Sequence, residues 1–171
     1  MIRKLLSISA LFLVLLAANR SYATTVERLG LEDLTKKAQA IVVGRVTGVR
    51  TYWTTDRKYI LTDYTLEVGE SIKGATGRTI AVTTIGGKIG DIELYVSGMP
   101  LFQKGENAVV FIESTGNYQT VLGLEQGKFT VANGEVVNSV VGLSYLDGRP
   151  GNPVKMPFQT FKNQIRTFLD R

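Results

Sequence analysis

The stretch RTYWTTDRKY, residues 50–59, gathers the residue types best suited to holding a ligand. Aromatic rings interleaved with basic side chains stack on sugars or bases, or anchor a contact with a protein. The alternative is packing at the end of the fold, because large aromatic residues are usually mostly buried, with the bases left in solvent. The candidate binding residues are three bases and three aromatics, one of them the only tryptophan: Arg50, Arg57, Lys58, Tyr52, Trp53 and Tyr59.

Four acids in or beside strand-like segments could supply general acid–base chemistry: Asp63, Glu67, Asp91 and Glu93. A glycan hydrolase needs two convergent carboxyl groups, one of them in an apolar pocket. Asp63 and Glu67 lie on one face of one predicted strand, where opposing bases such as Arg45 would pair with them across the sheet. We therefore interpret them as a solvated polar face and predict no catalytic residue.

Histidine and cysteine are both absent from the sequence. The chain therefore has no Ser-His-Asp or Cys-His nucleophile system, no His-based zinc site and no disulfide. Asp147-Gly148 begins like a calcium loop, but the alternating acids and closing glutamate of that loop are missing. The sequence predicts no metal and no cofactor.

Five glycines punctuate TTIGGKIGDIELYVSGMPLFQKGE, residues 83–106. A phosphate-binding loop requires G-x-x-x-x-G-K-[ST] at the start of a helix, whereas strand-like residues follow these glycines. We interpret them as turn residues. Because long irregular connections often carry function, residues 86–105 are a second, weaker candidate for contacts.

The first 23 residues have the pattern of a secretory signal peptide, with a basic start, an apolar run from Leu5 to Ala18 and a small-x-small motif ending at Ala23. The run is shorter than the ~20 residues that cross a bilayer, although an uncleaved anchor is the alternative. We expect cleavage after Ala23, leaving residues 24–171 as one domain in the periplasm or outside the cell. Its 17 basic and 15 acidic residues form no block of like charge, which argues against a nucleic-acid partner.

Residue periodicity predicts a mainly β fold with a helix near each end. Residues 26–39 favour a short helix with a charged outer face. β-Branched runs and period-two alternation predict strands over 40–49, 58–72, 78–85, 92–96 and 106–113. NYQTVLG after Gly116 is expected to pair with the last of these as a hairpin, and Asn133-Gly134 predicts a further hairpin with a type I′ turn.

A second helix is predicted after Pro157, which suits a first helical turn. Phe158, Phe161, Ile165 and Phe168 fall on one face of it. We interpret this apolar stripe as docking on the β-barrel of the same chain, with binding of a partner as the alternative.

Three motifs, KAQAIVVGRV, YTLEVGESIKG and LFQKGENAVVFI, resemble the strand pattern of netrin-like modules, the OB-fold group that includes the tissue inhibitors of metalloproteases. The resemblance covers about half of residues 24–171 and implies a small OB-like β-barrel in an exported protein. The whole chain is also similar to uncharacterised exported bacterial proteins with a helix–barrel–helix layout.

The inhibitors of that group are rich in disulfides and chelate the protease zinc with an N-terminal cysteine. This chain has no cysteine, and its expected mature N-terminus is Thr24, so no inhibitory residue carries over. We expect an exported, non-catalytic binding or interaction module whose ligand is a protein or polysaccharide, without stable insertion in a membrane. The alternatives are a protease-inhibitor-like regulator acting through residues 86–105 and a carboxylate-dependent glycan hydrolase.

Overall fold

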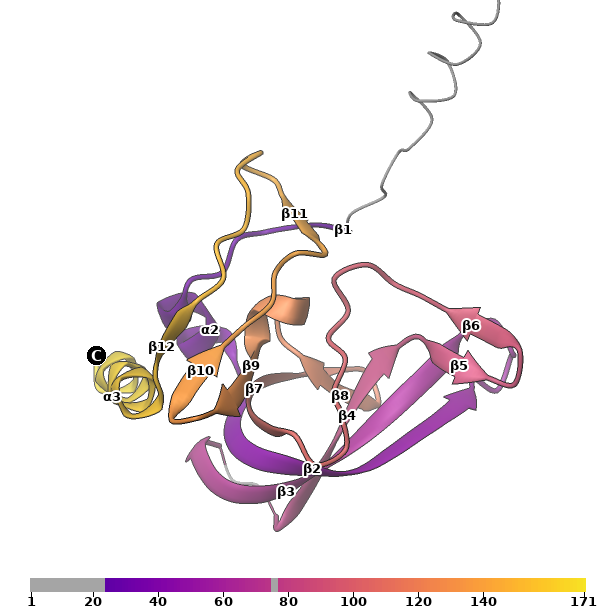
Figure 1. The fold of residues 1–171 in the computed structure, drawn as a ribbon, viewed down its shortest axis with the longest axis horizontal. Coiled ribbons are helices and arrows are strands. Elements are labelled where there is room, and N and C mark those ends of the chain that lie inside the picture. Colours follow the sequence, from indigo (N-terminus) through magenta and orange to yellow (C-terminus); the bar gives the residue numbers. More distant parts are fainter. Residues whose placement is uncertain (1–23, 75–76) are drawn as a thin grey trace, which may run out of the picture.

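A computed structural model describes residues 24–74 and 77–171, so the predicted signal peptide lies outside the described residues. The fold is mainly β, with two α-helices (Figure 1). No helix among the described residues is long and apolar enough to span a membrane.

Eight strands form the main sheet. They are β2 (Ala40–Trp53), β3 (Ile60–Lys73), β4 (Thr79–Ile85), β7 (Asn107–Thr115), β8 (Tyr118–Val121), β9 (Lys128–Ala132), β10 (Glu135–Val137) and β12 (Lys155–Pro157). The strand order is β12-β10-β9-β7-β2-β3-β4, and β8 pairs with β7 outside this path. All pairs within the sheet are antiparallel. Two smaller sheets hold β1 (Thr24–Val26) with β11 (Leu143–Tyr145) and β5 (Gly87–Ile89) with β6 (Ile92–Leu94).

The sheet does not close into the barrel that was expected. β4 and β8 lie beside each other, but no hydrogen-bonded register joins them among the described strands. Since β4 pairs only with β3, and β8 only with β7, a seam is left between them. The predicted mainly β class is confirmed, and the barrel is replaced by an open, curved sheet (Figure 1).

Of the two longest strands, β2 runs further than its sequence pattern predicted, whereas β3 covers residues 60–73 where 58–72 were predicted. β2 continues from the predicted end at residue 49 to Trp53, because Thr51, Tyr52 and Trp53 are good strand formers that pair with residues 60–62. The stretch at 50–59 is therefore not all loop, and the connection between the strands is limited to residues 54–59.

Apolar side chains fill both faces of the sheet. The inner face of β2, β3, β4, β7 and β8 encloses one core, in which Tyr64 and Phe102 pack with ring centroids 4.8 Å apart. The opposite face of β2 and β7, with β9 and β10, packs against α2 (Leu31–Lys37) and α3 (Phe158–Leu169). Strands buried on both faces explain the dense apolar runs of β2 and β7.

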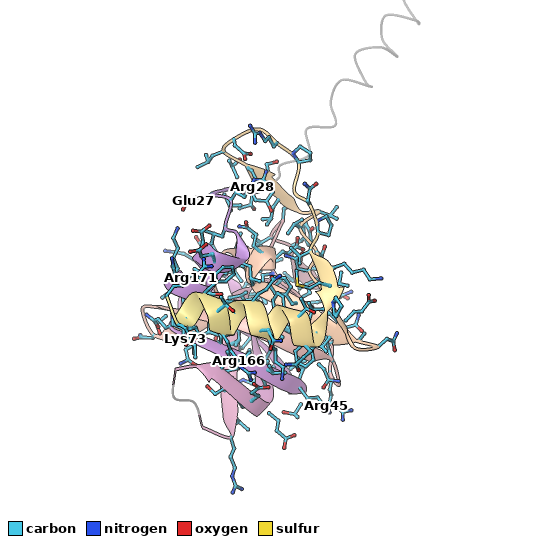
Figure 2. The ribbon with its side chains drawn as sticks, turned by 90° about the vertical axis from the view of Figure 1, so that its left-hand side faces the viewer. Glu27, Arg28, Arg45, Lys73, Arg166 and Arg171 are labelled. Carbon is cyan, nitrogen blue, oxygen red and sulfur yellow. The ribbon has the colours of Figure 1, made fainter. Side chains whose placement is uncertain are left out.

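The C-terminal helix docks on its own chain, as predicted. Phe161 and Ile165 are fully buried, and Phe158 and Leu169 pack at the margin of the core. Phe168, predicted on the same face, is half-buried and is replaced at that margin by Leu169. The Phe161 ring lies 4.5 Å from that of Phe129 and meets that of Phe111 edge-on. Figure 2 shows α3 crossing in front of the sheet, with Arg166 on the side where it pairs with Glu70 of β3.

The N-terminal helix is shorter than predicted. α2 spans seven residues, because Val26 belongs to β1 and Gly30 stays extended at the N-cap. The Asp33 carboxylate accepts a hydrogen bond from the Gly30 N–H, which fixes the start of the helix at Leu31. Residues 26–30, predicted to be helical, therefore lie outside the helix.

The N-terminal segment is clasped to a distant part of the chain. β1 pairs in parallel with β11, and the Thr24 hydroxyl donates to the Ser97 carbonyl. Arg28 donates to both oxygens of Asp147 and stacks over the Tyr145 ring at 4.0 Å. These contacts gather β1, β11 and the connection after β6 at one end of the molecule (Figure 1).

Candidate functional site

The six candidate binding residues are divided between two faces and one turn. Arg50 and Tyr52 project from the outer face of β2, whereas Trp53, next in the strand, projects from the opposite face and is half-buried. Arg57, Lys58 and Tyr59 are exposed in the connection from β2 to β3. The structure therefore brings Arg50 and Tyr52 together and separates them from Trp53.

A polar network links Tyr52 to the two neighbouring strands. The Tyr52 hydroxyl donates to Asp63 Oδ1 of β3 at 3.0 Å, and the Thr83 hydroxyl of β4 donates to the same oxygen at 2.8 Å. The Arg50 guanidinium lies 5.0 Å from the centre of the Tyr52 ring. Burial, and then the hydrogen bond to the Asp63 carboxylate, raise the pKa of Tyr52 to about 12, so the phenol remains a donor at neutral pH.

An apolar row runs beside this network on the same outer face. Tyr52 is paired across the strands with Leu61, and Leu61 is paired with Ile85. Cross-strand partners project from the same face of a sheet, so the three side chains are neighbours. Ile85 is 42% exposed although it is a large aliphatic residue, which marks this end of β4 as an uncovered apolar surface.

The row leads into a groove of about 370 Å³ between β4 and β8, which we call the seam groove. Most of its lining is apolar, and Tyr118 of β8, 44% exposed, is its one aromatic residue. Hydroxyl groups of threonines from both strands and the Glu113 carboxylate complete it. The lining residues are Leu61, Thr83, Thr84, Ile85, Met99, Glu113, Thr115, Tyr118, Thr120, Val121, Gly123 and Leu124.

Unpartnered strand edges border the seam groove. The Gly86 N–H donates to Ile60, so alternation along β4 turns the backbone groups of residues 83 and 85 away from β3. The Leu122 N–H donates to Phe111, so residues 119 and 121 of β8 turn theirs away from β7. Both sets point into the seam, where no ladder is present among the described strands.

The charge of the groove comes from Glu113. This carboxylate is half-buried and forms no ion pair with any residue that the structure describes. Asp63 lies close by, one hydrogen bond from Thr83 of the lining. The groove thus offers an apolar surface, hydroxyl groups and a negative charge without an ion-pair partner among the described residues. Within the described part of the chain, no group of three acidic, histidine or cysteine side chains could hold a metal ion.

A larger hollow of about 560 Å³ lies beside the Lys128–Glu106 ion pair, and the charged groups of that pair are already engaged. Glu106 accepts hydrogen bonds from Lys128, the Thr130 hydroxyl and the Gln103 N–H, and Lys128 also donates to the Leu101 carbonyl. This cluster ties the connection after β6 to β9, and we assign it a structural role.

Of the segment 86–105, Met99 is the residue that lines the seam groove. Residues 87–94 form the β5–β6 hairpin, with Gly90 at φ 60° in its turn. Pro100 is buried and Met99 is half-buried against the seam groove. Tyr95 and Leu101 are the exposed apolar residues of the connection.

Sequence reasoning missed Leu61, Ile85, Glu113 and Tyr118, because strands distant in the sequence bring them together. A signal for one of them was present. Leu61 is the only apolar residue among the polar positions of its face in β3, next to Asp63, Thr65 and Glu67, and such an exception in a period-two pattern indicates a covered patch on an otherwise wet face.

Compared with known proteins, the chain matches no family model, no curated protein and no solved structure.

Proposed function

We propose that the chain is an exported, non-catalytic binding module that holds a protein or polysaccharide ligand on the outer face of its open sheet. The observation that carries the proposal is the seam groove. Apolar side chains at the edge of a sheet are normally covered by a neighbouring element, so a place where a sheet stays open and apolar is suited to a ligand.

The fold supports an OB-like interpretation of this site. The strands β2, β3, β4, β8 and β7 follow one another around a partly open ring. OB-folds bind ligands on the face of their second and third strands, with the loop after the first strand and the loop between the last two. The corresponding elements here are β3, β4, residues 54–59 and the tight turn before Tyr118.

Export is part of the proposal and has its own test. If the first 23 residues are a signal peptide cleaved after Ala23, the exported protein begins at Thr24. Intact mass measurement of the protein recovered from the periplasm or medium should give residues 24–171. A mass that includes the leader in that fraction would contradict cleavage and favour an anchor.

The binding site is tested by capture with matched tyrosine variants. The chain expressed from its full 171-residue sequence is immobilised and offered the exported proteins of its source and a glycan array. Tyr118→Ser should abolish capture of a specific ligand, because exposed aromatic residues dominate such contacts. Tyr59→Ser removes a tyrosine of similar exposure from the β2–β3 connection and should leave capture intact.

The opposite result would move the site. Loss of capture with Tyr59→Ser and not with Tyr118→Ser would place the ligand on residues 54–59 and refute the groove. Circular dichroism of both variants must match the wild type for either outcome to count. Capture of nothing beyond the background of the denatured chain would refute the binding module itself.

A further inference from the structure

The outer face of the β7–β8 hairpin carries four side chains that line the seam groove. Glu113 is paired across the hairpin with Thr120, and Thr115 is paired with Tyr118. Cross-strand partners project from one face of a sheet, as do residues two apart in a strand, so the four side chains form one patch. All four belong to the lining of the groove, and we call them the hairpin quartet.

The polar groups of the hairpin quartet are not engaged by the protein. Glu113 has no ion-pair partner among the described residues, and none of the hydrogen bonds between described residues uses its carboxylate or the hydroxyls of the quartet. Asp63 of β3 differs, because one of its oxygens already accepts hydrogen bonds from Tyr52 and Thr83. A half-buried carboxylate that loses water to a ligand needs new donors, so the ligand must supply them to Glu113.

Much of the remaining lining is apolar. Leu61 and Ile85 are cross-strand partners on the outer face of β3 and β4, and Met99 and Leu124 add to the apolar lining. A sugar ring matches this division, since its faces carry C–H groups and hydroxyl groups surround its rim. The C–H groups suit apolar walls and the electron-rich face of an aromatic ring, which Tyr118, 44% exposed, supplies.

Other classes of ligand fit this lining less well. Among the described residues that line the groove there is no lysine or arginine, so a phosphate, a fatty acid or an acidic glycan would meet only the like charge of Glu113. A neutral lipid chain would cover that carboxylate without supplying a donor, which leaves a charge buried and unsatisfied. A strand of a partner protein cannot enter, since β4 and β8 already lie side by side (Figure 1).

A second aromatic residue extends the same face. Tyr52 is the cross-strand partner of Leu61. Burial and the Asp63 hydrogen bond raise the pKa of Tyr52 most, and the Tyr118 phenol adds to the rise, so the two tyrosines are neighbours. The groove, of about 370 Å³, is near the lower end of ligand pockets, which run from roughly 300 to 1,000 Å³. It therefore suits a short stretch of a sugar chain, which continues across Tyr52.

We propose that the seam groove binds a neutral polysaccharide through a sugar ring set against Tyr118, with hydroxyl groups of that ring donating hydrogen bonds to Glu113. This inference rests on the proposed binding function and names its ligand. The hydroxyls of Thr115 and Thr120 bind the remaining rim of the ring, and the apolar surface around Ile85 covers its C–H groups.

The test uses the chain expressed from its full sequence and fluorescently labelled hexasaccharides of glucose, mannose and N-acetylglucosamine. Each neutral hexasaccharide is compared with two derivatives of itself. In one the hydroxyl groups are methylated, which removes the donors, and in the other the primary hydroxyls are oxidised to carboxylates, which adds negative charge. Affinities are measured by fluorescence polarisation, and capture of the exported proteins of the source is measured in parallel.

A neutral hexasaccharide should bind, and its methylated and oxidised forms should bind about tenfold more weakly or worse, the usual effect of losing hydrogen bonds to a charged group. Glu113→Gln should lower the affinity for the neutral form about tenfold and narrow the gap to the oxidised form. Tyr118→Ser should abolish binding, whereas Tyr118→Phe, which keeps the ring, should lower the affinity less than about threefold. Glu93→Gln, an exposed carboxylate of the β5–β6 hairpin, is the matched control and should change nothing.

The outcomes separate the inference from the proposed function. Capture of an exported protein that depends on Tyr118, with no neutral hexasaccharide bound, would overturn the sugar inference and leave the binding module standing. Equal affinity for the neutral and methylated forms, or an unchanged affinity in Glu113→Gln, would also overturn it, since the hydroxyl donors would not matter. Absence of Tyr118-dependent binding in both arms would overturn the inference and the groove together.

Discussion

Removing the Phe161 ring tests whether the C-terminal helix and the sheet are one cooperative unit. The side chain is fully buried between the rings of Phe129 and Phe111. Phe→Ala at such positions costs about 3–5 kcal/mol, through lost transfer energy and the cavity left behind. Alanine is the better helix former by about 0.5 kcal/mol, which offsets a small part. We expect Phe161→Ala to lower the free energy of unfolding by about 3 kcal/mol or more.

Urea unfolding measures this loss, with helix content followed by far-UV circular dichroism and the sheet followed by Trp53 emission. Trp53 lies in β2, whose first half packs on the helices while its far end does not, so it reports on a region away from α3. Both signals should shift together to a lower midpoint. Phe168→Ala is the matched control, since Phe168 is half-buried on the same helix and should cost under about 1.5 kcal/mol.

Two results would refute the reasoning. A cost below about 1 kcal/mol, or one equal to that of Phe168→Ala, would mean that Phe161 is not packed in the core. Loss of helical signal alone, with Trp53 unaffected, would mean that α3 melts independently of the sheet. If Phe161→Ala does not fold at all, Ile165→Val, expected to cost about 0.5–1.5 kcal/mol, gives the same comparison more gently.

Three further predictions each concern a single residue. In Gly134→Val, the loss of a residue at φ 77° in the β9–β10 turn should cost about 1–2 kcal/mol in urea unfolding through backbone strain alone, because no atom lies within 4 Å of the new Cβ. The Lys162 hydrogen bond holds the pKa of Glu70 below its usual range, so Glu70→Gln should have a lower free energy of unfolding than the wild type at neutral pH. This difference in free energy should vanish as the pH falls through the pKa of Glu70 in the folded protein. An equal difference at acid and neutral pH would contradict this. Since the pKa of Tyr52 is raised to about 12, any stability from its neutral phenol is present below pH ~10 and is lost as the pH rises through the pKa of the folded protein. Asp63→Asn should shift the ionisation of Tyr52 to lower pH. An absorbance titration measures this shift, with Tyr52→Phe identifying the signal of Tyr52.

Local patterns were sufficient for much of the fold. Asn133-Gly134 was correctly predicted as a hairpin turn, since both residues adopt positive φ, which few other residue pairs tolerate. The period-two alternation of β3 also holds, as does the apolar stripe of α3 apart from Phe168, because both are determined by neighbours within a few residues.

Long-range pairings were not accessible to the same reasoning. Thr24–Val26 and Leu143–Tyr145 are three-residue strands with no periodicity of their own, and each exists only because the other is present. The seam between β4 and β8 is likewise a long-range feature. Whether β4 and β8 form a ladder depends on the curvature of the whole sheet, which no local pattern encodes.

The candidate site, too, was visible in the sequence only in part. The cluster at residues 50–59 was visible in the sequence, but a strand extending to Trp53 distributes its side chains over two faces. Tyr52 retains a place beside the groove through Leu61, whereas Glu113 lies on β7 and Tyr118 on β8, two strands that the sequence predicted to pair only with each other.

The clasp at the start of the domain sets the order in which the chain is completed. Arg28 and Asp147 are 119 residues apart, and β1 has no partner until β11 has been made. A chain emerging from the ribosome or a translocation pore can assemble β2 to β10 while its first residues still lack a strand partner. The N-terminal segment is therefore secured late, only once residues 143–147 have been made, and a chain arrested before residue 147 would keep that end accessible to proteases and processing enzymes.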